Sequence, residues 1–212
     1  MAGQVLGARE LKRRARMEEL LTLERGYWAR GLSVAGMDEV GRGPLAGPVV
    51  AACVMLSPDG VLPGVDDSKK LSESRREQLA PLIRAAAQFV GLGSASPERI
   101  DEINILNATR EAMNQAAQGC GCGVLLVDAM EGLDCGCPTE SIVHGDATSY
   151  MIAAASIVVK VHRDALMREY DALYPEYGFA RNKGYGTAEH IAALCKYGPC
   201  PIHRRSFISK WL

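Results

Sequence analysis

Two adjacent carboxylates, Asp38 and Glu39, stand in a segment whose flanks have the composition of a buried strand. Apolar residues precede them at 34–35 and follow the next loop at 49–56. Because consecutive residues of a strand face opposite sides, one of the two charges would be buried unless the strand is distorted, which Gly41 makes easy. A core accepts a buried carboxylate only beside a metal ion, an opposite charge or a substrate. This segment is therefore the predicted active centre.

Two more acids, Asp128 and Asp146, are expected at a strand edge and at a helix start. Each has a simpler alternative: Asp146 could cap the helix predicted to begin near residue 148, and Asp128 could begin a turn. Carboxylates that converge at one edge of a sheet repel each other and have raised pKa values unless divalent cations lie between them. Hard oxygen ligands favour Mg²⁺ or Mn²⁺ over Zn²⁺.

A glycine-rich loop follows the first acid pair. Arg42 lies between Gly41 and Gly43, where it could pair with Glu39 or belong to a loop whose backbone approaches a sugar–phosphate chain closely. Tyr185, also between two glycines, could stack on a base or sugar or simply anchor its loop. Basic side chains that could contact phosphates, although single ones are more often only solvated, are Lys69, Lys70, Lys160, Arg163, Lys183, Arg204 and Arg205.

The composition, 212 residues of which 48% are hydrophobic, predicts one substantial core. No apolar run is long enough to span a bilayer and the N-terminus lacks the order of a secretory signal, so we expect a cytoplasmic protein outside any membrane. The net charge is +3 over residues 1–30, −8 over 31–150 and +4 over 151–212. This distribution suits an acidic centre that holds cations and basic ends that meet a polyanion, but solvated helix faces would produce it too.

The seven cysteines are an odd number without secretory context, which indicates reduced thiols. Two C-x-C pairs, Cys120/Cys122 and Cys135/Cys137, could together form a four-thiolate zinc site. Structural zinc sites usually have two to four residues between paired cysteines. We therefore interpret both pairs as small residues in glycine-rich loops, and the sequence leaves open whether they bind metal.

Hydrophobic periodicity predicts alternating strands and helices without an internal repeat or a long linker. The N-terminal helix is expected to pack beside the first strand, with a loose basic arm touching nucleic acid as the alternative. Asn104 and Asn107 are expected to share a helix face, since they are three residues apart. The predicted helices are 9–28, 72–87, 97–118, 148–170, 187–197 and 203–212, and the predicted strands are 33–40, 49–56, 88–94, 124–128 and 142–143.

The run Gly36-Met-Asp-Glu-Val-Gly-Arg-Gly-Pro-Leu-Ala-Gly-Pro-Val-Val50 resembles the signature of the ribonuclease HII family. Matching segments in family order extend this similarity over about residues 34–207. Two positions depart from the family pattern: Ala129-Met130, where many members have glycine, and His144, where a lysine commonly precedes the Gly-Asp pair. The further matching segments are 67–71, 104–109, 127–128, 145–146, 152–164, 177–179, 183–187 and 203–207.

The resemblance implies an RNase H-like α/β fold, with a central mixed five-stranded sheet flanked by helices. It divides the chain into an N-terminal helical extension (1–31), a catalytic domain (32–172) and a small C-terminal helical subdomain (173–212). It implies an endonuclease that hydrolyses the RNA strand of RNA–DNA hybrids and nicks duplex DNA on the 5′ side of single embedded ribonucleotides. Such cleavage leaves 3′-hydroxyl and 5′-phosphate ends and serves ribonucleotide excision repair.

Carried over position by position, the family's metal-binding and catalytic acids fall on Asp38, Glu39, Asp128 and Asp146, which would hold two Mg²⁺ or Mn²⁺ ions. The loop Gly41-Arg42-Gly43 corresponds to the part that recognises the ribonucleotide 2′-hydroxyl. Tyr185 corresponds to the tyrosine that packs against the following deoxyribose. We expect further substrate contacts from Lys69, Lys160, Lys183 and Arg204.

Two other functions remain in view. Another metal-dependent nuclease of the same fold would share the acids but would not need a 2′-hydroxyl reader such as the Gly-Arg-Gly loop. A non-catalytic hybrid-binding module would gain nothing from carboxylates that face phosphates. We expect a monomer, and residues 207–212 contain no obvious clamp-binding motif, so a sliding clamp as partner is unsupported.

Overall fold

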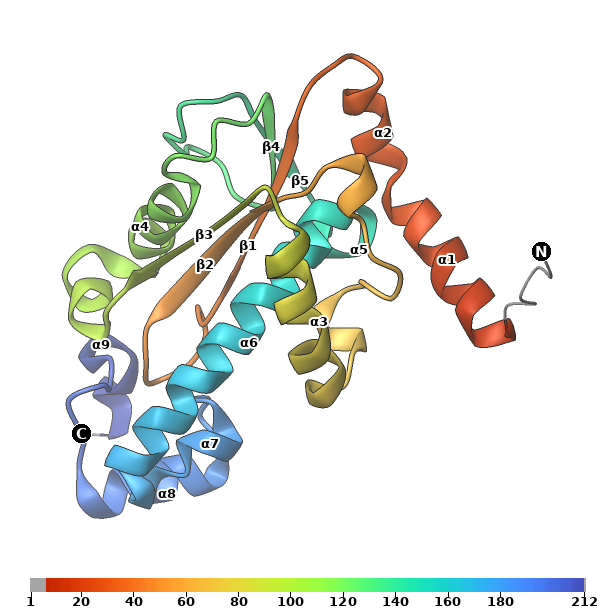
Figure 1. The fold of residues 1–212 in the computed structure, drawn as a ribbon. Coiled ribbons are helices and arrows are strands. Elements are labelled where there is room, and N and C mark those ends of the chain that lie inside the picture. The colour runs from red at the N-terminus through yellow and green to blue at the C-terminus, as the bar shows by residue number, and fades with distance from the viewer. Residues whose placement is uncertain (1–6, 212) are drawn as a thin grey trace.

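The computed structural model describes residues 7–211 and has a central five-stranded sheet (Figure 1). Strands β2 and β3 continue antiparallel from β1 on one side, and β4 and β5 run parallel to it on the other. The predicted mixed sheet is thus confirmed, with the order β3-β2-β1-β4-β5. The strands are β1 Val34–Val40, β2 Val49–Met55, β3 Phe89–Ala95, β4 Val124–Asp128 and β5 Thr139–Ile142.

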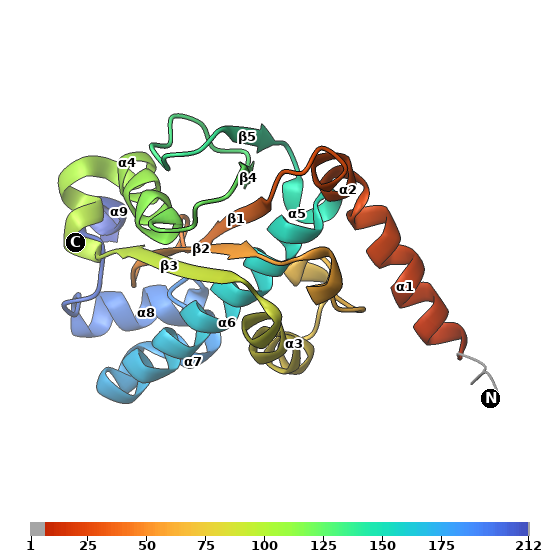
Figure 2. The same ribbon diagram turned by 45° about the horizontal axis from the view of Figure 1, so that its top comes forward.

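The central strands are buried on both faces, as Figure 2 shows. Val50, Ala52 and Val54 of β2 face a core that includes residues of α3 (Glu73–Ala86) and α6 (Tyr150–Leu173). The residues between them face a second core formed with α4 (Pro97–Ala117). Alternate residues of an extended strand point to opposite faces, so a strand covered by helices on both faces has to be apolar throughout.

The long helix α6 crosses β1 at Gly36. A Cβ on this glycine would lie 2.1 Å from the backbone carbon of Met151, so only glycine allows the contact. The helix begins immediately after Ser149, whose side chain accepts a hydrogen bond from the backbone N–H of Ile152. Asp38 follows Gly36 by two residues and therefore faces the same side of the sheet as α6.

The N-terminal helix predicted for 9–28 is two helices, α1 (Ala8–Leu20) and α2 (Thr22–Trp28). Helix α2 packs beside β1 as expected, and its Glu24 accepts hydrogen bonds from Ser149 Oγ (2.6 Å) and Met151 N (3.0 Å). Arg16 of α1 donates to Ala147 O at 2.7 Å. These contacts hold both helices against the start of α6. Residues 1–6, part of the predicted extension, and Leu212 lie outside the described residues.

Three other element predictions were wrong in detail. Asn104 has a positive φ of 66° that breaks α4, and its side chain accepts from the N–H groups of Leu106 and Asn107, so Asn104 and Asn107 do not share a helix face. The last strand is β5 rather than 142–143. The predicted helix 203–212 is a single turn, α9 (Arg205–Ile208), followed by a 3-10 turn at Ser209–Trp211.

The C-terminal part packs on α6 through Met167, Tyr177 and Phe179. No helix within residues 7–211 is both long and apolar enough to cross a membrane. The division at 31 and 172 into three parts remains a prediction. The remaining elements are α5 Gly145–Thr148, α7 Phe179–Asn182, α8 Ala188–Tyr197 and 3-10 turns at Pro58–Gly60, Ser68–Lys70 and Pro175–Tyr177.

Replacing Gly36 by alanine should destabilise the protein by about 2–4 kcal/mol, because neither β1 nor the α6 backbone can yield 1 Å without disturbing both cores. Urea unfolding of Gly36→Ala measures the free energy. Gly26→Ala is the matched control, since nothing lies within 4 Å of a Cβ there and alanine favours helix α2. Equal stability of the two variants would contradict this view of the crossing.

Candidate active site

The sheet brings the predicted acids to one edge. Asp38 and Glu39 lie near the end of β1, and Asp128 is the last residue of β4. Met37 pairs with Val127 in the parallel register of these strands, so Asp38 and Asp128 are neighbours. Asp146 reaches the same place from α5, which follows β5. Four carboxylates far apart in the sequence are therefore gathered where parallel strands end.

The sequence left simpler roles open for two of these acids, a helix cap for Asp146 and the start of a turn for Asp128. The structure gives both acids other surroundings. Ser149 rather than Asp146 caps α6. The carboxylate of Asp128 accepts a hydrogen bond at 2.8 Å from the N–H of Gly145, the residue before Asp146. This bond fixes the spacing between two of the acids.

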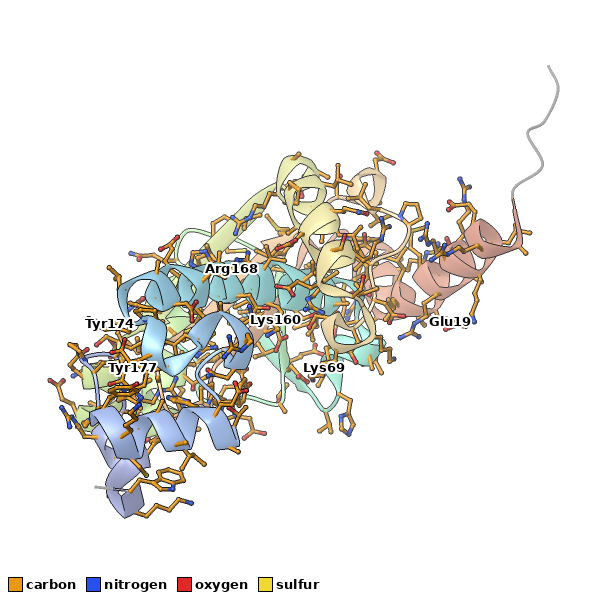
Figure 3. All side chains as sticks on the ribbon, turned by 90° about the horizontal axis from the view of Figure 1, so that it is seen from below. Glu19, Lys69, Lys160, Arg168, Tyr174 and Tyr177 are labelled. Carbon is orange, nitrogen blue, oxygen red and sulfur yellow. The ribbon has the colours of Figure 1, made fainter. Side chains whose placement is uncertain are left out.

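Three of the four acids, Asp38, Glu39 and Asp128, line a cleft of 310 Å³ that also includes side chains from α3, α6 and the C-terminal part. Lys69 and Lys160 project on the same side of the molecule in Figure 3. Arg76 also lines the cleft, although sequence reasoning missed it, because one arginine within a polar helix gives no signal. The lining consists of Asp38, Glu39, Val40, Ser68, Lys69, Arg76, Asp128, Ser156, Val159, Lys160 and Tyr185.

Crowding raises the pKa values of three of the acids. Removal from water raises the pKa of Asp38 well above its usual value, and the charges of Glu39 and Asp128 raise it further. Removal from water is also the main reason why the pKa values of Glu39 and Asp128 are raised. A divalent cation would reverse this effect, because it stabilises the ionised carboxylates.

In this structure the carboxylates form ion pairs with basic side chains and accept hydrogen bonds from backbone N–H groups. Lys69 Nζ lies 2.8 Å from Asp146 Oδ2, and Arg42 Nη1 lies 3.5 Å from Glu39 Oε1, the pairing that the sequence left open. Within residues 7–211, no group of three or more histidine, cysteine, aspartate or glutamate side chains is already arranged around an ion position. The Lys69 side chain is 79% exposed and can withdraw. An all-oxygen donor set with an ammonium group on one member fits Mg²⁺ or Mn²⁺.

Two buried arginines hold the loop from Gly41 to Pro48. Arg204 donates to the carbonyl oxygens of Gly47 (3.0 Å) and Arg42 (3.0 Å), and also to that of Gly41. Its side chain is 0% exposed and donates to the loop, so in this structure Arg204 positions the loop, and its contact with substrate stays a prediction. The sequence does not show whether a given basic side chain faces solvent or is buried against backbone carbonyl groups.

Arg163 of α6 performs the same task from the other side. It donates to the carbonyl oxygens of Pro48 (3.0 Å), Ala46 (3.1 Å) and Lys183 (2.9 Å). It is fully buried, and its donors are directed at the loop backbone. The Lys183 side chain is only 14% exposed and pairs with Glu73 at 3.6 Å.

Tyr185 lies beside the same loop. Its side chain is 44% exposed, and a Cβ built on Gly43 would lie 3.7 Å from its ring. Lys160, which pairs with Asp164 at 2.7 Å, lines the cleft with it. Loop, tyrosine and acids therefore surround one opening.

A chain of two buried histidines supports Tyr185. His203 Nδ1 accepts from the N–H of Cys200 (3.0 Å), its Nε2 meets His190 Nε2 (3.0 Å), and His190 Nδ1 meets Tyr185 O (2.9 Å). One arrangement satisfies all three contacts: both rings neutral, with His203 donating to His190 and His190 donating to Tyr185. Sequence reasoning missed this pair: His203 begins the matching segment 203–207, but nothing in the sequence indicates that it contacts His190.

The contribution of His203 to stability should therefore fall as the pH falls from about 6.5 to about 4. Burial lowers the pKa of His203 from 6.5 to about 4, so in this range an unfolded chain binds a proton that the folded one refuses. The free energy of unfolding of His203→Gln should depend on pH less steeply, by up to about 1.4 kcal/mol per pH unit. His144→Asn, at an exposed site whose positive φ suits asparagine, is the control. An unchanged slope in His203→Gln would contradict the neutral pair.

Comparisons with known proteins show the family of this chain. The family model described as ribonuclease HII matches residues 35–210. Ribonuclease HII of Caldanaerobacter subterraneus subsp. tengcongensis is 53% identical over 207 residues, covering 96% of this chain and 85% of the relative. Ribonuclease HII of Levilactobacillus brevis is 56% identical over 189 residues, covering 88% and 73%.

Solved structures have the same fold. Ribonuclease H2 from Pyrococcus horikoshii OT3 matches with a TM-score of 0.71 and 25% identity, over 85% of this chain and 97% of that chain. RNase HII from Archaeoglobus fulgidus, in its complex with PCNA, matches with a TM-score of 0.71 and 26% identity, over 83% and 94%. The chain therefore belongs to the ribonuclease HII family and is a type 2 ribonuclease H, a metal-dependent endonuclease that acts on nucleic acid.

Proposed function

We propose that this enzyme cuts the RNA strand of RNA–DNA hybrids and nicks duplex DNA 5′ of a single embedded ribonucleotide, leaving 3′-hydroxyl and 5′-phosphate ends. One observation carries the proposal. The loop Gly41–Pro48 begins two residues after Glu39; Arg204 holds its Gly41–Arg42 end and Arg163 its Ala46–Pro48 end, beside the acids. A loop so placed inspects the sugar next to the phosphate that is cut.

The four acids would hold two divalent ions, Mg²⁺ or Mn²⁺. Asp38 and Asp146 would hold one, and Asp38 with Glu39 and Asp128 the other. Bound ions supply a more acidic water and stabilise charge on the phosphate oxygens. Lys69 has to leave Asp146 for this, and its exposed chain can then reach a neighbouring phosphate.

Recognition of the sugar would use the loop backbone. The 2′-hydroxyl is both donor and acceptor and is the group that distinguishes RNA from DNA at one nucleotide. Gly41 and Gly43 have no side chain to keep the sugar away, and the exposed ring of Tyr185 can pack against the next deoxyribose. Lys160 and the partly exposed Lys183 would lie along the flanking phosphates. A monomer would suffice, because one chain contains every group used.

The test is cleavage of a DNA duplex that contains one ribonucleotide, beside the same duplex made entirely of DNA. With Mg²⁺ or Mn²⁺, the enzyme should nick the first on the 5′ side of the ribonucleotide and leave the second intact. Equal cutting of both, or of neither at any metal concentration, would refute the proposal.

Asp38→Asn should abolish nicking, by roughly 10³-fold or more, because it removes the ligand shared by both ions. Duplex binding and the thermal unfolding curve should be retained, and loss of a repulsive charge can even raise stability. Binding by fluorescence anisotropy and circular dichroism measure these. A variant that cleaves at the wild-type rate would exclude Asp38 from the chemistry.

Arg204→Lys should lower nicking at the ribonucleotide about 10-fold or more, because one ammonium group cannot donate to the Gly41, Arg42 and Gly47 carbonyls together. The neighbouring Arg205→Lys is the matched control, since the side chain there is exposed. Rates on hybrid and single-ribonucleotide duplexes separate loop positioning from general binding. Equal rates for both variants would show that the loop does not need Arg204.

A further inference from the structure

Two Cys-Gly-Cys segments that are distant in the sequence lie side by side. The first, residues 120–122, leads into β4, and the second, residues 135–137, leads into β5. These strands pair in parallel from Leu125 and Thr139 onward, so their starting points are neighbours (Figure 2). The Sγ atoms of Cys122 and Cys137 are 3.3 Å apart.

The glycine in each segment is there for its backbone conformation. Gly121 has φ +60° and Gly136 has φ +69°, a region that favours glycine. Nothing lies within 4 Å of a Cβ built on either residue, so packing does not demand glycine. The same left-handed turn thus recurs between two cysteines in both segments.

The thiols form a connected cluster. Cys120 lies 3.8 Å from Cys53, shares a hydrogen bond with Cys122, and Cys122 contacts Cys137. Thiols grouped in this way can share one cation at the start of β4, as the carboxylates can at its other end.

We propose that Cys120, Cys122, Cys135 and Cys137 bind one structural Zn²⁺ ion. Thiolates prefer this ion, and tetrahedral Zn–S bonds of about 2.3 Å place sulfur atoms roughly 3.8 Å apart. The Cys122–Cys137 distance of 3.3 Å is within 0.5 Å of that spacing. The short C-x-C spacing, unusual for zinc, is compensated because the two strands align two such segments.

The four thiols are not yet gathered around a common point. Cys120 is turned toward Cys53, and the Cys135 thiol donates to Asn114 Oδ1 at 3.6 Å. Both residues lie in loops, so rotation of their side chains completes the site. Within the described residues no preassembled metal cluster exists, which is equally true of the acids.

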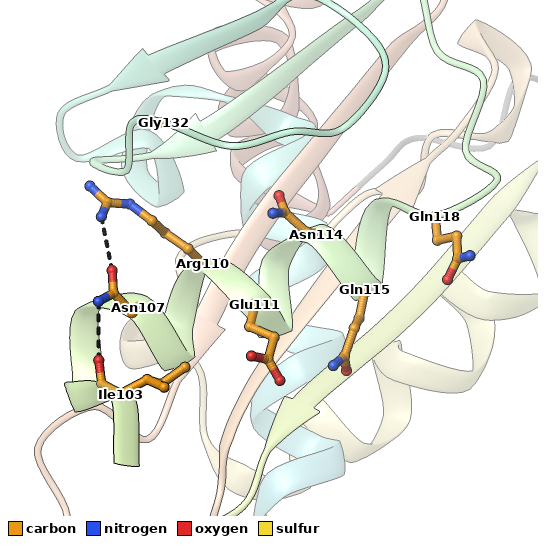
Figure 4. A pocket seen from close by; sticks show the side chains of 8 residues that line it. All are labelled: Ile103, Asn107, Arg110, Glu111, Asn114, Gln115, Gln118 and Gly132. Carbon is orange, nitrogen blue, oxygen red and sulfur yellow. Dashed lines mark hydrogen bonds between the residues drawn. The ribbon is translucent and has the colours of Figure 1, made fainter. Parts of the chain in front are cut away.

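A zinc ion here would secure the segment that follows Asp128. Between β4 and β5 this segment is held to α4 by Asn114, which accepts from Asp134 N (3.0 Å), and by Arg110, which donates to Glu131 O (3.1 Å). Figure 4 shows Arg110 extending toward Gly132 of this segment. The ion would tie the end of this connection, before β5, to the segment before β4 and so steady the strand that ends in Asp128.

The test uses the full chain, purified under reducing conditions without a strong chelator. Elemental analysis should find about one zinc ion per chain, retained after Mg²⁺ and Mn²⁺ have been dialysed away. Metal-free protein reconstituted with Co²⁺ should show sulfur-to-metal charge-transfer absorption and the strong visible bands of a tetrahedral ion. Cys122→Ser and Cys137→Ser should lose both signals.

Two controls separate this site from others. Cys195→Ser, which removes an exposed thiol on α8, and Asp38→Asn, which alters the acid site, should keep the zinc and the Co²⁺ spectrum. The Co²⁺ spectrum of the wild-type protein shows whether thiolates bind the ion even where a serine variant does not fold. The proposal is overturned by wild-type protein without a Co²⁺–thiolate spectrum, by zinc binding that Cys122→Ser retains, or by a mass two hydrogens lower from a Cys122–Cys137 disulfide.

Discussion

Repulsion among carboxylates at the end of β1 and β4 is the constraint on which this structure depends. Four acids share one edge of the sheet, and removal from water together with mutual charge raises the pKa of Asp38 well above its usual value. Such an arrangement survives only because rigid elements impose it. The parallel pairing of β1 with β4, the close crossing of α6 at Gly36 and the Gly145–Asp128 hydrogen bond together leave the acids no freedom to separate.

Besides the repulsion among the acids, the desolvation of two arginines opposes folding: both are buried among the carbonyl groups of the loop after β1. Burial lowers the pKa of Arg204 to about 9 and that of Arg163 to about 10, so both guanidinium groups are desolvated. Hydrogen bonds to backbone oxygens of the loop offset this desolvation. The gain is positional, since the loop is fixed relative to Asp38 and Glu39 from two separate parts of the chain. The proposed recognition of a sugar and cleavage beside it would both require that register.

Much of this could be predicted from the sequence. Adjacent acids within an apolar strand have few structural explanations, and a continuous apolar run marks a strand buried on both faces. Contacts between distant segments could not be predicted: nothing local distinguishes the buried Arg204 from the exposed Arg205, or pairs His190 with His203. The break at Asn104 depends on a side chain that caps the helix turn it interrupts. The C-x-C pairs were interpreted as loop residues from their spacing, with metal binding left open, because their alignment comes from strand pairing and is not visible in the sequence.

The central claim is that the four acids form a binding site for divalent cations. Without the ions, Lys69 forms an ion pair with Asp146, one of these acids. Anomalous diffraction from crystals grown with Mn²⁺ tests this directly. We predict manganese peaks ligated by Asp38 with Glu39, Asp128 and Asp146, and Lys69 Nζ moved away from the Asp146 carboxylate, which it approaches to 2.8 Å without the ion. Crystals saturated with Mn²⁺ that show no peak between these acids, with Lys69 still bound to Asp146, would contradict the account.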